Sequence, residues 1–296
     1  MLPLVPTPLI RLGNLFPRPD VHAKCEFLAP SGCFKVRGAT HLLEHLDREG
    51  RRPQLIVPSM GNTALGAAAG AKAFGFRMTG VVPQTIARAK DEKLQALGVE
   101  LIKIAGGGSD LLRCATDIAK ERDGYFVHPH LDALWTDGYQ SIAAEVLHAL
   151  PGCRSLVFPV GGGGLLMGLL AYLRKNPAPV RLFGCEPYNY PKYARFDHAR
   201  STTIADGLLL EAPHPQVQQR IAEDQVAVHL VPEADIPTAL KALFEAQALV
   251  VEPSSAITTA FVQAHNAELE EPICVILTGE NIAREDHARY MSEPVA

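Results

Sequence analysis

The sequence predicts an α/β protein with open, mostly parallel sheets, on the strength of two observations. Short apolar or alternating runs, typical of strands, keep alternating along the chain with segments of helical periodicity. Several junctions between a strand-like run and the next helix-like segment carry small polar or glycine-rich loops. In open parallel sheets such loops converge at the carboxyl ends of the strands, so they point to one shared binding site. Periodicity alone leaves open whether the strands form one sheet or two.

The predicted elements follow each other along almost the whole chain. Strands are expected at residues 21–27, 54–58, 78–82, 101–104, 125–127, 155–160, 180–185, 226–231 and 273–277. Helices are expected near residues 35–49, 62–74, 86–97, 110–122, 139–149, 164–175, 234–247, 254–267 and 281–291. The longest irregular segment, 188–215, is rich in Tyr, Pro and His, and long loops are often functional.

Composition restricts the class of protein and its partners. With 296 residues, 47% hydrophobic and 20% charged, the chain is an ordinary globular one. A net charge of −4 without a basic block argues against nucleic-acid and membrane partners, and no apolar run approaches the ~18 residues of a membrane span. The N-terminus lacks the pattern of a secretion signal, so we expect a cytoplasmic protein. The six cysteines are scattered without a C-x-x-C pair and predict reduced thiols, with no metal or disulfide framework.

Lys35 stands at the start of the first predicted helix, three residues after the turn-forming Pro30-Ser31-Gly32. The free N–H groups and the positive dipole of a helix start disfavour an ammonium ion there. A lowered lysine pKa suits imine formation, since only the neutral amine attacks an aldehyde. Taken alone, the pattern is far more typical of a solvated surface lysine, so the prediction depends on the other residues described below.

Two loops after predicted strands supply sites for anions. Ser59, Met60, Gly61, Asn62 and Thr63 offer N–H groups and hydroxyls suited to a carboxylate, although a plain helix cap is an alternative. Gly161, Gly162, Gly163 and Gly164, before Leu165, let the backbone approach an anion at a helix start, which predicts a phosphate site. No Lys-Ser/Thr follows and the dinucleotide fingerprint is incomplete; a flexible hinge is the alternative.

Neutral polar groups complete the set. Asn62 can donate to a phenolate-like oxygen, and Thr278, after the last strand, can offer its hydroxyl to a ring nitrogen. A lysine, a phosphate cradle, a carboxylate cradle and these two groups together suit pyridoxal 5′-phosphate holding an amino acid. A neutral partner at the pyridine nitrogen favours β-elimination over transamination.

From Thr7 to Asn281 the sequence resembles the fold-type II pyridoxal-phosphate family, in its serine/threonine dehydratase and serine racemase branch. The resemblance is carried by Ser31–Ala39, Gly61-Asn62, Gly161–Leu165, Glu186-Pro187, Thr203–Gly207, Glu252-Pro253-Ser254 and Thr278-Gly279-x-Asn281. It implies two open twisted, mostly parallel sheets with flanking helices, the tryptophan synthase β-like fold. It also implies a large domain of residues 1–51 and 132–296, a small mobile domain of residues 52–131, and a homodimer.

The resemblance also implies roles for individual residues. Lys35 would be the Schiff-base lysine, and Asn62 would bind the cofactor 3′-oxygen. Gly161–Leu165 would hold the phosphate, and Thr278 the pyridine nitrogen. The other implied contacts are Phe34 against one face of the cofactor, Gly207 near the other, and Glu252 beside it.

Several residues depart from the family pattern. Met60 stands where racemases place a serine, and a thioether cannot carry the proton that racemisation needs. Thr63 replaces the usual dehydratase histidine, Cys33 a Ser/Thr, and Glu280 a glycine. Lys192 stands where a metal-binding Asp would be expected near Glu186; its ammonium would neutralise Glu186, so we expect no tight Mg²⁺ site. With Ala296 as the last residue, we expect no regulatory domain of the kind some dehydratases carry.

The sequence therefore predicts an ammonia-lyase that converts a β-hydroxy amino acid such as L-threonine or L-serine into a 2-oxo acid and ammonia. One alternative is a β-replacement synthase of the cysteine synthase type, in which a nucleophile captures the same intermediate. A serine racemase is a further one. Outside catalysis by this cofactor, the alternatives are a phosphate- or nucleotide-binding module and an adapter with a decayed site.

Overall fold

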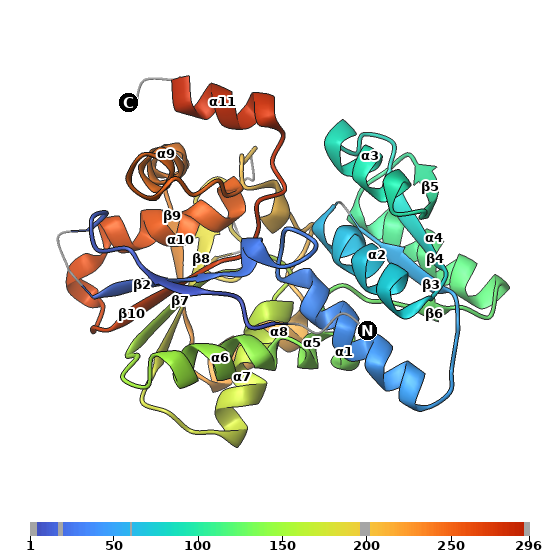
Figure 1. The fold of residues 1–296 in the computed structure, drawn as a ribbon, viewed down its shortest axis with the longest axis horizontal. Coiled ribbons are helices and arrows are strands. Elements are labelled where there is room, and N and C mark those ends of the chain that lie inside the picture. Colours follow the sequence, from blue (N-terminus) through green and yellow to red (C-terminus); the bar gives the residue numbers. More distant parts are fainter. Residues whose placement is uncertain (1–4, 17–19, 60, 196–201, 293–296) are drawn as a thin grey trace.

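The computed structural model describes residues 5–16, 20–59, 61–195 and 202–292, and the strands of this part of the chain form two sheets (Figure 1). The larger sheet has the order β1 (Leu9–Arg11), β2 (Val21–Cys25), β10 (Ile273–Leu277), β7 (Ser155–Pro159), β8 (Arg181–Pro187) and β9 (Ala227–Val231). The smaller sheet has the order β5 (Glu100–Ile104), β4 (Met78–Pro83), β3 (Leu55–Pro58) and β6 (Tyr125–Phe126). The two mostly parallel sheets that were predicted are confirmed.

Strand β1 was not predicted. It pairs antiparallel with β2, with Ile10 opposite Ala23, whereas the other strand pairs are parallel. Three residues are too few for alternation to reveal a strand from sequence. Strand β10 lies between β2 and β7 and runs parallel to both. The carboxyl ends of three strands, from the start, the middle and the end of the chain, therefore meet at one edge of the larger sheet.

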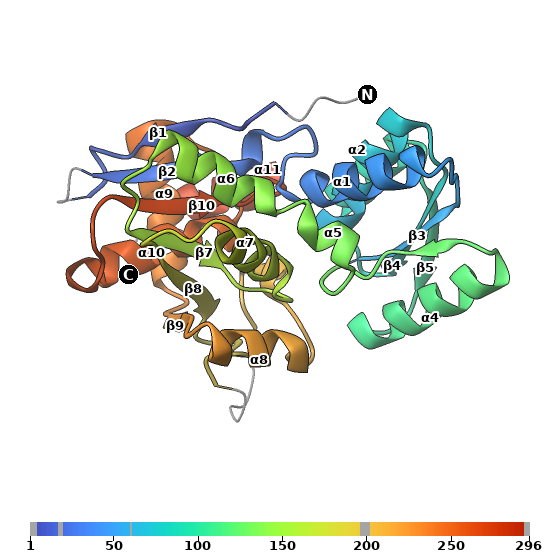
Figure 2. The same cartoon turned by 90° about the horizontal axis from the view of Figure 1, so that it is seen from below.

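Helices cover both sheets (Figures 1 and 2). They are α1 (Lys35–Arg48), α2 (Asn62–Phe74), α3 (Arg88–Ala96), α4 (Gly108–Glu121), α5 (Ala133–Asp137), α6 (Gln140–Ala149), α7 (Gly164–Lys175), α8 (Pro215–Glu223), α9 (Asp235–Gln247), α10 (Pro253–Ala264) and α11 (Arg284–Ser292), with 3₁₀ turns η1 (Glu26–Leu28), η2 (Asp206–Leu208) and η3 (Asn266–Glu268). Sequence reasoning missed the short helices α5 and α8, and it continued the strand after Val21 through η1.

Helix α1 packs closely against α2 because α2 carries glycines at the contact. A Cβ atom added at Gly66 would lie 2.6 Å from the Cβ atom of Lys35, and one at Gly70 would lie 2.9 Å from that of Ala39. Gly38 allows the same approach on the other side of α1, where Trp135 of α5 lies. The start of α1, and with it Lys35, is therefore held between α2 and the helices of the larger sheet.

Three clusters of buried apolar residues stabilise this arrangement. The largest runs from the smaller sheet through α1 to α6 and α7. The second lies between the larger sheet and α9 and α10, and the third between the smaller sheet and α4. Because the first cluster includes residues beside both sheets, burial of one continuous core joins them.

The strands of the smaller sheet all fall inside residues 52–131, the segment expected to form a mobile small domain; that it moves as a unit remains a prediction. In the part of the chain that the structure describes, the helices are too short or too polar to cross a lipid bilayer.

Candidate active site

Lys35 is placed beside the carboxyl end of β10 by backbone contacts on either side of the turn. The Phe34 N–H donates to the Thr278 carbonyl at 3.0 Å, and Cys33 forms a β-bridge with Gly279. The Lys35 Nζ atom lies 4.7 Å from the centre of the Phe34 ring, which packs in turn on Tyr139. These contacts place the amine beside two aromatic rings, and Lys35 as a whole is half-buried.

Burial is the main reason that the pKa of Lys35 falls from 10.5 to about 8, while the charges of Cys33 and Glu252 act in the opposite direction. The lowered pKa was expected, but the cause differs, because the sequence argument relied on the helix start. A substantial share of Lys35 is thus the neutral amine at mildly alkaline pH.

A buried ionic network fixes the first turn of α1. The guanidinium of Arg37, two residues after Lys35, binds Glu26 through Nε at 2.7 Å and Glu145 through Nη1 at 2.6 Å. Lys24 binds the same Glu145 from β2. Because Arg37 is buried, both carboxylates compensate its charge, and the position of Lys35 follows from this network.

The tetraglycine loop lies next to Lys35 and opens helix α7. A Cβ atom at Gly162 would fall 2.2 Å from the His130 ring, and Gly163 has φ +88°, so neither position accepts another residue without strain. Phe34, Lys35, Asn62, Leu165, Gly207, Glu252 and Thr278 line the same small cavity as Gly161–Gly164. The structure thus brings together the residues predicted to bind the cofactor.

The amide of Asn62 is engaged within the protein. Its Nδ2 donates to both oxygens of Glu252, at 2.8 and 3.0 Å, and its Oδ1 accepts from Asn281 at 3.1 Å. Burial raises the pKa of Glu252, and the ammonium of Lys90 partly opposes this rise. Sequence reasoning aimed Asn62 at a ligand and did not foresee that Glu252 already binds it.

The loop from Ser59 to Thr63 differs from the expected cradle in one respect. The Ser59 Oγ atom accepts hydrogen bonds from the backbone N–H groups of Gly61 at 2.9 Å and Ala64 at 3.1 Å. The amide of Gly61 is therefore used inside the loop, contrary to expectation. As the first residues of α2, Asn62 and Thr63 have amides without a partner in the preceding turn of the helix. Met60 lies outside the described residues.

Thr278 and Gly207 are held by two serines at the start of α10. Thr278 Oγ1 lies 3.0 Å from Ser255 Oγ, and the Gly207 N–H donates to Ser254 Oγ at 3.0 Å. Thr278 is buried and its hydroxyl is neutral, so it can donate to or accept from a ring nitrogen.

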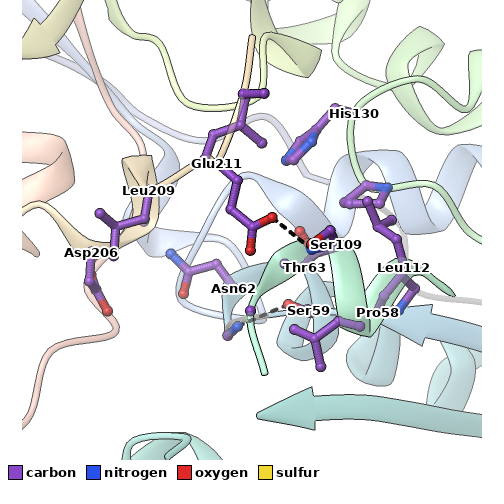
Figure 3. Close-up of a pocket in the computed structure, with 18 of the residues that line it drawn as sticks. Pro58, Ser59, Asn62, Thr63, Ser109, Leu112, His130, Asp206, Leu209 and Glu211 are labelled. Carbon is purple, nitrogen blue, oxygen red and sulfur yellow. Dashed lines mark hydrogen bonds between the residues drawn. The ribbon is translucent and has the colours of Figure 1, made fainter. Parts of the chain in front are cut away.

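A larger cavity of about 430 Å³ opens beside Lys35 and the Ser59–Thr63 loop (Figure 3). Its walls come from both halves of the molecule. Lys90 of α3 pairs with Asp206 at 2.7 Å, and the Ser109 N–H donates to Glu211 at 3.1 Å. Burial alone would lower the pKa of Lys90, but Asp206 and Glu252 outweigh it and the pKa is raised. Sequence reasoning missed Lys90 because one lysine in a charged helix carries no distinguishing signal.

Lys192 and Glu186 form the ion pair that was expected in place of a metal site. Lys192 Nζ lies 3.3 Å from Glu186 Oε1, and both side chains are fully buried. The backbone N–H groups of Lys192, Tyr193 and Ala194 also donate to this carboxylate. Among the described residues, histidine, cysteine and acidic side chains form no cluster of three suited to a metal ion.

Comparison with known proteins identifies the family. A family model described as "Pyridoxal-phosphate dependent enzyme" matches residues 1–279. The chain belongs to this family. Its cofactor is pyridoxal phosphate, and the protein is an enzyme of the lyase type.

Individual relatives of this pyridoxal-phosphate enzyme agree with that assignment. It is 30% identical to an L-threonine ammonia-lyase of Geobacter sulfurreducens, over 88% of this chain and 67% of the relative. It is 28% identical to the catabolic L-threonine dehydratase TdcB of Staphylococcus aureus, over 93% of this chain and 84% of the relative. Among solved structures, a threonine deaminase from T.th. superposes with a TM-score of 0.85 at 27% identity, covering 95% of this chain and 94% of that one.

The residues present fit pyridoxal phosphate. The four glycines of the loop present backbone amides without side chains to the small cavity, and these amides precede a helix of 12 residues. Lys35, with its lowered pKa, and the neutral hydroxyl of Thr278 line the same cavity as this loop. An aldehyde, a phosphate and a ring nitrogen thus each have a chemically suitable partner.

Proposed function

We propose that this enzyme eliminates water from a β-hydroxy amino acid such as L-serine or L-threonine, yielding a 2-oxo acid and ammonia. The observation that carries the proposal is the position and the lowered pKa of Lys35. Its side chain lines both the small cavity of the tetraglycine loop and the 430 Å³ cavity. The relatives with threonine ammonia-lyase names support the same reaction.

Pyridoxal phosphate supplies an aldehyde that captures the substrate amine and a ring that withdraws electrons from its Cα atom. Lys35 is the residue that we assign to this aldehyde and, once released from it, to removal of the α-proton. An amine with a pKa of about 8 is a suitable base near neutral pH.

The other residues take positioning roles in the proposal. Gly161–Gly164 and Leu165 would hold the phosphate, Phe34 and Gly207 the two faces of the ring, and Thr278 its nitrogen. The Nδ2 group of Asn62 would donate to the 3′-oxygen in place of one of its two hydrogen bonds to Glu252. The amides of Asn62 and Thr63, with the hydroxyl of Ser59, would bind the substrate carboxylate; the wider set of Ser59, Met60, Gly61, Asn62 and Thr63 forms that side of the site.

Closure of residues 52–131 over residues 1–51 and 132–296 would exclude water from the reacting atoms. The Lys90–Asp206 and Ser109–Glu211 contacts support this part of the proposal because each joins the two halves across the cavity. A cytoplasmic homodimer without nucleic-acid or membrane partners completes it.

A substrate panel tests the function. Purified holoenzyme given L-serine or L-threonine alone should release equal amounts of 2-oxo acid and ammonia, and Lys35→Ala should abolish both. A synthase would need a second substrate before it consumed serine, and a racemase would return D-serine without ammonia. Release of neither product from any β-hydroxy amino acid would refute the elimination.

A further inference from the structure

Three histidines on segments distant in the sequence have their rings in contact, and two of them, His130 and His214, line the large cavity. His128 and His130 follow β6, and His214 directly precedes α8. The Nδ1 atom of His130 lies 3.1 Å from the Nε2 atom of His214. The Nδ1 atom of His128 instead accepts hydrogen bonds from the backbone N–H groups of His130 and Leu131. His128 therefore stabilises the turn that carries His130. The His130–His214 pair has no part in the functions described above.

The pair connects the reaction centre with the outside. His130 lines both the large cavity and the tetraglycine cavity, together with Lys35. Its ring packs against Gly162 and points into the cavity from the side opposite Asp206 (Figure 3). His214 lines the large cavity only and is half-buried. A proton could therefore pass from solvent through His214 to the position of a bound substrate.

The surroundings keep His130 uncharged. Burial lowers its pKa well below 6.5, and Lys35, His214 and His128 reinforce the effect. Burial also lowers the pKa of His214, whose backbone N–H donates to the Tyr193 hydroxyl at 3.2 Å. A neutral His130 that accepts a hydrogen bond on Nδ1 must carry its own proton on Nε2, which makes that atom a donor.

We propose that His130 is the general acid that protonates the departing β-hydroxyl group, and that His214 resupplies it with protons from solvent. The inference rests on the proposed elimination. As the Cβ–O bond breaks and its electron pair stays on oxygen, the Nε2–H bond of His130 breaks and an O–H bond forms, so water leaves. His130 Nδ1 takes the Nε2 proton of protonated His214, which regains one from bulk water. His130 then carries its proton on Nδ1, and exchange of this proton through cavity water to Nε2 restores the donor before the next turnover. Lys35 returns the α-proton to solvent, so each turnover takes up and releases one proton.

A change of leaving group tests this role. Chloride departs without a proton, so β-chloro-L-alanine bypasses a general acid, whereas serine and threonine require one. In holoenzyme His130→Asn, kcat for the hydroxy amino acid should fall about 100-fold or more, while kcat for β-chloro-L-alanine stays within about threefold. His214→Asn should give the same pattern to a smaller degree. His148→Asn, at an exposed position of α6, is the matched control and should change neither rate.

Equal losses with both substrates would show a structural role and overturn the proposal. Unchanged rates with both would overturn it too, since the proton would then come from elsewhere, such as the cofactor phosphate. If the unmodified enzyme acted on neither substrate, the elimination itself would fail, and with it this inference.

Imidazole nitrogen NMR shifts give a readout without turnover. The Nδ1 signal of His130 should move in His214→Asn and stay in place in His148→Asn. An Nδ1 signal that does not respond to His214→Asn would contradict the hydrogen bond on which the relay depends.

Discussion

The Nζ atom of Lys90 lies 2.7 Å from the Oδ2 atom of Asp206, and this ion pair joins α3, beside the smaller sheet, to η2, beside the larger one. Lys90 also packs on Gly61 in the loop proposed to bind the substrate carboxylate, because a Cβ atom at Gly61 would lie 2.7 Å from the Cδ atom of Lys90. One buried lysine thus links the position of the smaller sheet to the shape of the proposed carboxylate site.

Replacing Lys90 should weaken substrate binding more than it weakens the fold. Asp206 is about half exposed (52%), so loss of the pair costs on the order of 1 kcal/mol, equivalent to a KM about fivefold higher for Lys90→Met. Steady-state kinetics on the proposed substrates measure the change. Lys120→Met, at an exposed position of α4, is the control; an unaltered KM for Lys90→Met would show that the pair does not shape the site.

Attachment of the cofactor should depend on pH through Lys35. The neutral amine attacks the aldehyde, so the rate at which cofactor-free protein reacts with pyridoxal phosphate should rise with pH and level off above about 8. Borohydride reduction followed by peptide mass mapping should locate the adduct on Lys35. The adduct should be lost in Lys35→Ala but not in Lys120→Ala, and an adduct on another lysine would contradict the assignment.

The same lowered pKa affects stability. Between pH 8 and 10.5 the unfolded chain holds the Lys35 proton while the folded protein has released it, so the contribution of this group to the free energy of unfolding rises with pH across that window. Urea unfolding of cofactor-free protein, compared with Lys35→Met, isolates this contribution. The free energy of unfolding of the unmodified protein, minus that of Lys35→Met, should be constant below pH 8 and rise between pH 8 and 10.5. A difference that is constant at every pH would show that the pKa of Lys35 is not lowered.

Gly162→Ala should impair cofactor binding. The added Cβ atom would lie 2.2 Å from the His130 ring, and overpacking of this kind costs about 1–3 kcal/mol, equivalent to an affinity roughly 5- to 150-fold lower. Absorbance titration with pyridoxal phosphate measures the affinity. Gly152→Ala serves as the control because its Cβ atom would have no neighbour nearer than 3.8 Å. Equal affinities for the two variants would exclude a tight approach at Gly162.

Lys192→Met should destabilise the fold, because it leaves the buried carboxylate of Glu186 with backbone donors alone. Breaking a buried ion pair from one side costs about 3–5 kcal/mol, which equilibrium unfolding in urea measures. The double variant Glu186→Gln/Lys192→Met removes both charges and should recover most of the loss. If the single and double variants were equally stable, the pair would not be what compensates the charge of Glu186.

Local sequence patterns were enough to predict those features of this enzyme that consist of consecutive residues. Alternating apolar runs predicted the mostly parallel sheets, and four consecutive glycines before a helix predicted a phosphate site, because exposed backbone amides at a helix start suit an anion. Lys35 was singled out in a similar way, since its turn and helix start are contiguous. Short elements such as β1 and α5 escaped because a few residues show no period. Helix α8 (Pro215–Glu223) escaped because it is mostly polar, with Val217 as its buried residue.

What the sequence determined by itself was the class of fold and the cofactor, because both follow from local patterns and motifs; the assignment of Lys35 to that cofactor remains a prediction. The tertiary structure alone decided which further contacts the side chains of the site make. It placed Glu252 on Asn62, Lys90 over Gly61, and His214 next to His130. Those contacts join residues about 30 to 190 positions apart, and their pKa shifts arise from burial and from charges that only folding brings close.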